Sequence, residues 1–389
     1  MRGWRLERRA ERSRLALVLA PVAALLATLA LTSLLVAWAG APVGRAYALL
    51  LEGGFGSRFA IAETLTRATP LILTGLAAAL AFRARLYNIG AEGQLYLGAL
   101  AAVAVGGLHG GEGFLAAVPV WLLLTAMLLA AAAAGALLLL GPALAKSRLG
   151  VDEVVTTLLL NFIVLLLVSA MLDGPMKDPG ALGWPQSVAI ADALQLDKLV
   201  GRSRVHSGLL LALAAALALW ALLRWTTLGF EIRAVGANAR AAAFAGMPVG
   251  AVTVKVALLS GALAGLAGAV EVAGRAGYVT LDMAPGVGYS GIVIAMLAGL
   301  HPLGVVAASV FVAGVLVGAD SMSRAVNVPT YIADVIVALA LISMLVASVA
   351  VHYRFPPKRP SAASPRGGAA SGPAEPDPRR PLENGARRG

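Results

Sequence analysis

The sequence contains no cysteine, which excludes disulfide bonds, thiolate nucleophiles and cysteine-ligated metal sites. Its four histidines are scattered, and it has neither the H-E-x-x-H motif of zinc proteases nor the G-x-S-x-G motif of serine hydrolases. It also lacks the G-x-x-x-x-G-K-[ST] loop that cradles ATP phosphates. We therefore expect no catalytic residues, no metal ligands and no cofactor bound by this chain.

Charge is scarce as well. Only 13% of the residues are charged and 59% are hydrophobic, whereas about 25% of the residues in a typical soluble domain are charged. This composition indicates an integral membrane protein. The polar stretches are too short for a separate soluble domain of ordinary size, so the function must lie in or beside the bilayer.

The net charge of +11 is concentrated at the two ends of the chain. Residues 1–14 hold six Arg against two Glu, and residues 354–389 hold eight Lys or Arg against three acids. Basic ends are typical of the positive-inside bias, so we expect both termini in the cytoplasm and no nucleic-acid partner. The tail 354–389 is rich in Pro, Gly, Ala and Ser and predicts disorder, which leaves residues 15–353 as the transmembrane domain.

Apolar runs predict about ten membrane spans. The first run, 15–38, is too long for a signal peptide and is expected to be retained. An even number of spans keeps both ends on one side and places several basic residues in cytoplasmic loops, although the long outside loop 173–207 also carries basic residues. The ten predicted spans are 15–38, 69–82, 95–108, 115–140, 154–172, 208–223, 249–273, 287–300, 302–319 and 331–351.

The two halves of the chain contain similar segments. "LILTGLAAALA" (71–81) is similar to "LLSGALAGLAG" (258–268), and a Gly-rich polar break followed by an apolar run comes after each. Because five spans is an odd number, the second half would be inserted upside down. We therefore expect an all-α polytopic membrane protein with about ten transmembrane helices in two inverted five-helix repeats.

Within that plan, "GALAG" (261–265) and "GVLVG" (314–318) carry small residues four positions apart. This spacing lets helix backbones approach closely, and it predicts packing rather than chemistry.

Three polar residues, Asn88, Glu92 and Gln94, interrupt the apolar sequence at "LYNIGAEGQLYLG" (86–98). The predicted spans beside this break are short, and so is span 287–300 in the other half. Short, Gly-interrupted segments in matched positions indicate a translocation path, which these three side chains would line. The alternative is a cytoplasmic turn with Glu92 fully solvated, and the pattern alone does not decide between the two.

A second polar island follows at 147–164. Asp152 and Glu153 stand at a predicted helix start, where carboxylates cap free N–H groups. Asn161 lies inside an apolar span, and an amide there requires a hydrogen-bond partner. That partner is either a transported molecule or a neighbouring helix.

The segment 226–246 is unlike the other loops. Its charged and amide side chains alternate with Ala and Gly, which predicts a short helix across the membrane face that docks into a groove of a cytoplasmic partner. The alternative is an amphipathic linker on lipid headgroups, for which its mostly alanine face is small.

Together these stretches resemble the permease subunits of ATP-binding-cassette importers in the branched-chain amino acid, ribose and nucleoside superfamily. The resemblance rests on "LYNIGAEGQLYLGALAA", on "GVDEVVTTLLLNFIV" with the following "DGPMKDPG", and on "GFEIRAVGANARAAAFAGM". The second passage resembles the nucleoside (basic-membrane-protein-associated) branch, apart from Asp152, where Asn is expected. The likeness covers about residues 15–353, so this part is expected to be the permease domain.

The resemblance implies a nucleoside importer in a bacterial cell membrane. An extracytoplasmic binding lipoprotein would deliver the cargo, a second related permease would complete the pore, and a separate cytoplasmic ATPase would hold the ATP. The candidate substrate-path residues are Asn88, Glu92, Gln94, Glu153 and Asn161. The implied ATPase-coupling residues are Gly229, Glu231, Arg233, Gly236, Asn238, Arg240 and Gly246.

Two alternatives stay open at this point. The cargo of such a permease is poorly reported by its own sequence, so a monosaccharide or a branched-chain amino acid competes with a nucleoside. An ion-coupled secondary carrier is the other class of function, although the spans lack the chain of buried carboxylates expected of proton-coupled carriers.

Overall fold

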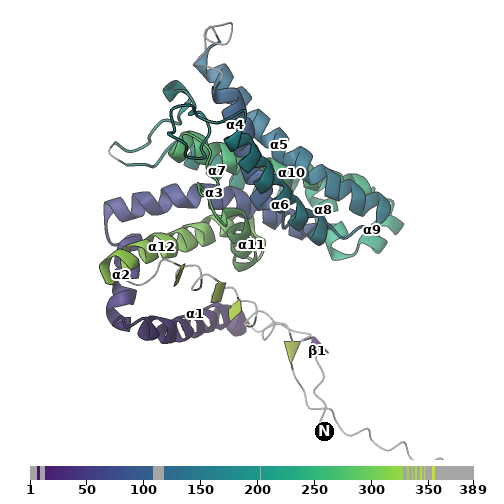
Figure 1. Cartoon of the computed structure of the whole chain (residues 1–389). Coiled ribbons are helices and arrows are strands. Elements are labelled where there is room, and N and C mark those ends of the chain that lie inside the picture. Colours follow the sequence, from purple (N-terminus) through teal and green to yellow (C-terminus); the bar gives the residue numbers. More distant parts are fainter. Residues whose placement is uncertain are drawn as a thin grey trace, which may run out of the picture.

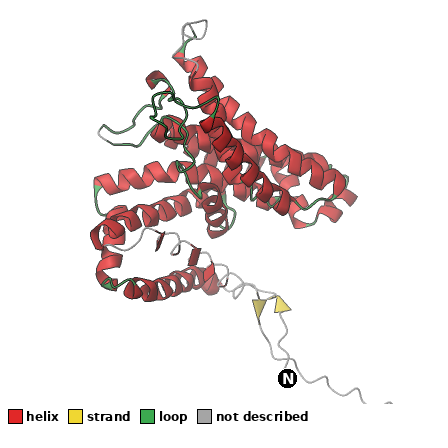
Figure 2. Cartoon of the chain, in the orientation of Figure 1, coloured by secondary structure: helices red, strands yellow, loops and turns green. Residues whose placement is uncertain are grey.

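The computed structural model describes residues 7–8, 14–107, 118–201 and 203–326, with scattered positions between 331 and 354. Over these residues the chain is helical, apart from loops and one antiparallel pair of two-residue strands, β1 (Glu7–Arg8) and β2 (Tyr353–Arg354) (Figure 2). The expected all-α class is therefore confirmed for the described part of the chain.

The helices follow the apolar runs and are bounded by recognisable caps. The Ser57 side chain accepts a hydrogen bond from the Ala60 N–H at the start of one helix, and Gly150 ends another in the left-handed region at φ 68°. The α-helices are α1 (Arg14–Trp38), α2 (Val43–Phe55), α3 (Arg58–Arg83), α4 (Ala91–Gly106), α5 (Val120–Leu149), α6 (Glu153–Asp173), α7 (Gly208–Trp225), α8 (Thr227–Ala237), α9 (Ala239–Phe244), α10 (Val249–Glu271), α11 (Val287–Leu297) and α12 (Pro302–Val326). Two shorter pieces complete them, the 3₁₀ turn η3 (Asp192–Leu194) and the π-helical turn η4 (Val272–Ala276).

Six helices of the described chain are long and apolar enough to cross a membrane: α3, α5, α6, α7, α10 with its continuation to Ala276, and α12. The segment Leu26–Trp38 of α1 passes the same test only together with α2, and the two are bent by 115° at the break between them. Helices α4 and α11 are apolar but shorter. The chain is thus a multi-pass membrane protein. Its described residues hold six candidate spans, or seven with the bent pair, so the expected number of about ten is not confirmed.

Most of the predicted spans coincide with helices. Spans 154–172, 208–223 and 249–273 match α6, α7 and α10 closely, and 287–300 is short, as expected. The last predicted span, 331–351, lies largely outside the described residues, as do the proposed basic N-terminus 1–14 and the tail 354–389.

The prediction of a short span at 69–82 is wrong. Helix α3 begins eleven residues earlier, at Arg58, and is 26 residues long. Its first turns hold Glu63 and Arg67, and these two charged residues lie before the predicted start of the span. The Arg67 guanidinium pairs with Glu63 and with Asp320 of α12, so the helix continues through these charges.

Close helix packing depends on glycine. A Cβ atom at Gly261 or Gly265 of α10 would collide with backbone oxygens of α5, and one at Gly318 of α12 would collide with Leu50 O of α2. The Phe55 ring of α2 lies against Gly314. The prediction that "GALAG" and "GVLVG" are packing motifs is confirmed, and α10 occupies the centre of the bundle between α3, α4 and α5 (Figure 1).

The bundle has two distinct ends, joined by α7. At one end the loop 174–207 packs on the turn after α10, where the Ser187 and Ile190 N–H groups donate to Val279 O (3.0 Å) and Gly277 O (2.9 Å). At the other end α7 is followed directly by α8 and α9 (Figure 1). We call these the loop end and the α8–α9 end.

Candidate functional site

The two short apolar helices, α4 and α11, begin against each other. Each follows a glycine N-cap, Gly90 for α4 and Gly286 for α11. A Cβ atom at Gly288 would collide with the Glu92 backbone nitrogen, so the first turns of the two helices are in contact. We call residues 86–94, together with 286–289 and the side chains that bind them, the helix junction.

Glu92 connects the two helices. Its carboxylate, only 3% exposed, accepts hydrogen bonds from the Gly286 N–H (2.7 Å) and the Gly288 N–H (2.6 Å). It also lies in the first turn of its own helix, α4. A negative charge is favourable at helix N-termini, and here one carboxylate lies beside two of them. The alternative that Glu92 is fully solvated in a turn is wrong.

Asn88 and Gln94 form a closed pair of amides. Each donates to the side-chain oxygen of the other, both at 2.9 Å, and the Asn88 oxygen also accepts from the Gly90 N–H (3.0 Å). Asn88 donates further to the Ser260 hydroxyl of α10 (3.2 Å), and that hydroxyl donates to Ala77 O of α3 (2.8 Å). The pair therefore ties the 86–90 linker to α10 and α3.

Asn161 binds the same linker from α6. Its side-chain oxygen accepts from the Gly93 N–H (2.8 Å), and its amide donates to Ile89 O (2.9 Å) and to the Tyr289 hydroxyl (3.0 Å). The side chain is completely buried. Its hydrogen-bond partners in the structure are thus backbone and a side chain of neighbouring segments.

Glu153 binds the entrance of the junction. It accepts from the Tyr87 N–H (3.1 Å) and pairs with Lys146, whose ammonium also donates to Arg85 O (2.7 Å). Asp152 accepts from the Val154 N–H (2.8 Å) and is the N-cap of α6, as predicted for this pair of acids.

The five predicted substrate-path residues, Asn88, Glu92, Gln94, Glu153 and Asn161, are therefore brought together in one network. All five are buried and all have protein partners. Contact with cargo stays a prediction for these residues. Their observed geometry fixes the position at which α4 and α11 begin.

The predicted coupling segment forms two helices, α8 and α9, joined at Asn238. The Asn238 side chain caps α9 by accepting from the Arg240 N–H (3.0 Å) and the Ala241 N–H (3.1 Å). Gly236 lies so close to Arg83 O that a side chain there would collide, and Gly229 is equally tight against α7. These two glycines hold α8 against the ends of α3 and α7.

The remaining predicted coupling residues lie on α8, on α9 and at the end of the segment. Arg233 donates to Leu223 O and is otherwise exposed, Glu231 is half-buried, and Gly246 ends the segment in the left-handed region at φ 83°. The sequence interpretation missed the aromatic rings here. Phe244 is 97% exposed on α9, and its place in a run of alanines is the signal that could have identified it.

Comparison with known proteins agrees with this architecture. Residues 60–345 match the family described as branched-chain amino acid transport system / permease component. No solved structure matches the chain.

Three relatives extend over most of the chain. The guanosine ABC transporter permease protein NupP of Bacillus subtilis (strain 168) is 37% identical over 342 residues, which cover 87% of this chain and 96% of NupP. The glucose ABC transporter permease protein TsgB13 of Haloferax volcanii is 40% identical over 347 residues, 86% of this chain and 88% of TsgB13. The nucleoside ABC transporter permease protein NupB of Lactococcus lactis subsp. cremoris is 27% identical over 318 residues, 80% and 85% of the two chains.

The resemblance seen in the sequence is thus confirmed over the bundle itself, from the first turns of α3 to beyond α12. Because the family match spans most of the chain and the guanosine permease is 37% identical along almost its whole length, the chain belongs to the permease-component family of ABC transporters.

Proposed function

We propose that this chain forms the translocation pore of an ATP-driven importer for nucleosides. The single observation that carries the proposal is the 37% identity to a guanosine permease along almost the whole length of both chains. A second relative whose printed name specifies nucleosides extends over four fifths of the chain. The chain would act with a second related permease, a cytoplasmic ATPase and an extracytoplasmic binding lipoprotein, and ATP would be bound by the ATPase alone.

Glucose import is the second candidate function, because the chain is 40% identical to a glucose permease. Branched-chain amino acids and an ion-coupled carrier rank lower. An uptake assay separates these functions: deletion of the gene should abolish uptake of radiolabelled guanosine in its own host. In the unmodified host, guanosine uptake should survive a protonophore and stop on ATP depletion. Competition by excess glucose would support the second candidate, and loss of uptake with the proton gradient alone would support an ion-coupled carrier.

The orientation proposed for the chain places the α8–α9 end in the cytoplasm. Basic residues from separate loops meet there, since Lys146 binds Arg85 O, Gly236 lies against Arg83 O and Arg233 binds Leu223 O. Such clustering is typical of the cytoplasmic side of membrane proteins. Both termini would then also be cytoplasmic, and the loop end would face outward.

The finer fold proposal is two inverted five-helix repeats. Its support is the reciprocal packing of the two halves: α4 packs on α10 as α11 packs on α3, and α5 packs on α10 as α12 packs on α3. The two breaks also correspond, because a glycine N-cap begins each short helix. Half-helices in matching positions of the two repeats are typical of transporter pathways.

We propose α8 and α9 as the element that docks on the ATPase. The projecting Phe244 ring is a suitable anchor, because exposed aromatic residues often dominate binding energy once a partner pocket covers them. Replacing it, Phe244→Ala, should weaken capture of the ATPase about thirtyfold, equivalent to about 2 kcal/mol. The matched control is Phe162→Ala on the exposed apolar face of α6. Equal capture by both variants would remove Phe244 from the interface.

A further inference from the structure

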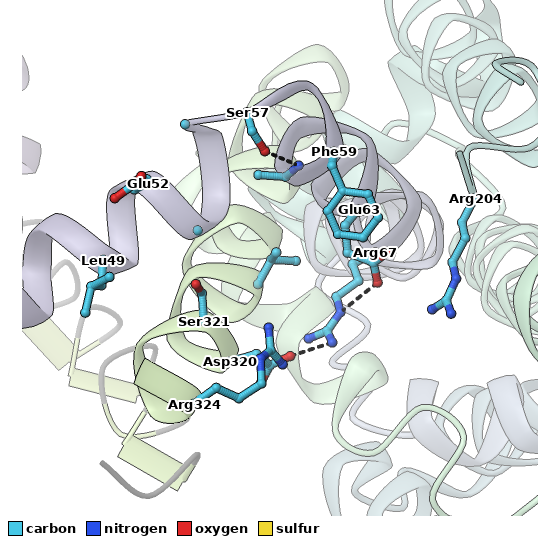
Figure 3. Close-up of a pocket in the computed structure, with 14 residues that line it drawn as sticks. Leu49, Glu52, Ser57, Phe59, Glu63, Arg67, Arg204, Asp320, Ser321 and Arg324 are labelled. Atoms are coloured by element: carbon cyan, nitrogen blue, oxygen red, sulfur yellow. Dashed lines mark hydrogen bonds and ion pairs between the residues drawn. The ribbon is translucent and has the colours of Figure 1, made fainter. Parts of the chain in front are cut away.

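A polar cavity of about 610 Å³ opens between α2, the first turns of α3 and the last turns of α12, and Arg204 of the loop 174–207 completes its wall (Figure 3). We call it the outer cavity, because α2 and the loop lie away from the α8–α9 end (Figure 1). Its volume falls within the range of small-molecule sites, roughly 300–1,000 Å³.

Charged residues of both signs line this cavity in equal number. The acids are Glu52, Glu63 and Asp320, and the bases are Arg67, Arg204 and Arg324. The wall therefore has no net formal charge. Such a wall offers hydrogen-bond donors and acceptors to a neutral polar ligand and gives no net Coulombic attraction to an anion such as a nucleotide.

The six charged side chains fall into two classes. Arg67 lies between Asp320, at 2.5 Å, and Glu63, at 3.8 Å. Glu52, Arg204 and Arg324 make no ion pair or side-chain hydrogen bond with any residue that the structure describes. One carboxylate and two guanidinium groups are thus available to a ligand, around an ion pair that connects α3 and α12.

An aromatic ring stands on the same wall. Phe59 lies in the first turn of α3 and is 71% exposed, and Glu63 follows about one helical turn later (Figure 3). A planar heterocycle gains stacking energy on such a ring, about 1–3 kcal/mol for a nucleobase. Carboxylates beside it can accept hydrogen bonds from sugar hydroxyls.

We propose that the outer cavity is a binding site for the imported nucleoside at the external mouth of this permease, with the base stacked on Phe59 and the ribose hydroxyls donating to Glu52. Arg324, on the same wall, would donate to acceptor atoms of the base edge. This site rests on the proposed nucleoside function and adds the residues that recognise the cargo. It lies apart from the helix junction, whose polar groups already bind one another.

The absence of cysteine from the whole sequence provides a direct test. Ser321 lines the cavity on α12 and makes no side-chain hydrogen bond with the described residues, so the Ser321→Cys variant introduces one thiol there. In cells expressing the complete transporter, a membrane-impermeant maleimide should label it. A nucleoside at ten times its Kd should slow that labelling about tenfold by mass action, and the corresponding nucleotide should not.

The matched control is Ser323→Cys, which is on the same helix, is also half-buried and does not line the cavity. Its labelling rate should be unaffected by nucleoside. Adding Phe59→Ala or Glu52→Gln to Ser321→Cys should remove the protection. Normal guanosine uptake without protection of Ser321→Cys would overturn the site and leave the nucleoside function standing. Protection by glucose or leucine but not by nucleoside would also overturn it, whereas lack of guanosine uptake by the unmodified transporter would overturn both proposals.

Discussion

The helix junction and the outer cavity are both polar regions of a predominantly apolar protein, and they use their polar groups in opposite ways. At the junction Asn88, Gln94 and Asn161 bind each other, neighbouring side chains or nearby backbone groups, and they are almost completely inaccessible. In the outer cavity Glu52 and Arg324 have no partner among the described residues and are exposed.

The difference follows from the surroundings. A buried polar group without a partner costs about 1–3 kcal/mol, so amides inside the bundle must be satisfied by the protein and thereby fix its geometry. A charge on an open cavity is solvated by water and can exchange that water for a ligand. Burial with complete hydrogen bonding thus indicates structure, whereas unpaired charges on a cavity wall are free to bind a ligand.

The largest expected effect is that of Asn161→Leu at the junction. The substitution leaves the Gly93 N–H, Ile89 O and the Tyr289 hydroxyl without their partner, at a cost of roughly 3 kcal/mol or more if each loss is about 1 kcal/mol. Thermal unfolding of the purified full-length protein should shift to clearly lower temperature, and uptake should fall with the amount of folded protein.

The control is Phe162→Leu on the next position of α6, which faces outward. It should leave both the unfolding temperature and uptake unchanged. A variant Asn161→Leu with normal stability and lost uptake would contradict the comparison, because it would make Asn161 a cargo contact, as the sequence interpretation allowed.

The next effect is that of Glu92→Gln. The amide retains one acceptor oxygen but places an NH₂ group against the second N–H, either Gly286 or Gly288. One charge-assisted hydrogen bond is lost, and the negative charge beside two helix N-termini disappears, at a cost of about 1.5–3 kcal/mol. Thermal unfolding would measure it, and the substitution Glu231→Gln on α8, half-buried and without a described partner, is the control. An equal shift in both variants would show that Glu92 does not hold α11.

The sequence predicted much of this architecture and less of its contacts. Apolar length identified α6, α7 and α10 almost to the residue, because uninterrupted hydrophobic runs have few alternatives in a membrane. The polar break at Asn88 and Glu92 was recognised as unusual, but their partners, such as Ser260 and Gly286, lie 172 and 194 residues away along the chain. No local pattern reports such pairings.

The same limit explains the missed elements. Arg67 and Glu63 interrupt the apolar pattern of α3, and only their position beside Asp320 of α12 shows that they belong inside a continuous helix. The outer cavity was missed for the same reason, since its wall is assembled from α2, α3, α12 and a loop. The exposed Phe244 was visible in the sequence, but its exposure was not.

The loop end should also make folding stability depend on pH. At the loop end His206 is buried, and the burial, with a smaller contribution from the Arg275 cation, lowers its pKa to about 4. The unfolded chain takes up a proton near pH 6.5, whereas the folded protein stays neutral at this position until about pH 4. The contribution of His206 to folding stability is therefore fully present above pH 6.5. It decreases as the pH drops towards 4, by about 2 kcal/mol at pH 5.

The measurement is the unfolding temperature as a function of pH. The His206→Leu variant should lose this part of the slope between pH 6.5 and 4, and His301→Leu, which replaces an exposed histidine, should keep it. An unchanged slope in His206→Leu would show that His206 is not held neutral by the fold.

The smallest expected effect on stability is in the outer cavity itself. Asp320→Asn breaks the ion pair with Arg67, but both side chains are about 30% exposed, at 27% and 32%, and water solvates the charges that are left. An ion pair of this kind contributes about 0–1 kcal/mol, so the unfolding temperature should change little, in contrast to the loss from Asn161→Leu at the junction. Adding salt should reduce the difference between Asp320→Asn and the unmodified protein further, since screening weakens exposed pairs.

A destabilisation by Asp320→Asn as large as that by Asn161→Leu would show that the Arg67–Asp320 pair is structural, and it would remove the distinction between the two regions. If Asp320→Asn costs little stability but clearly reduces nucleoside protection of Ser321→Cys, the charge of Asp320 contributes to binding.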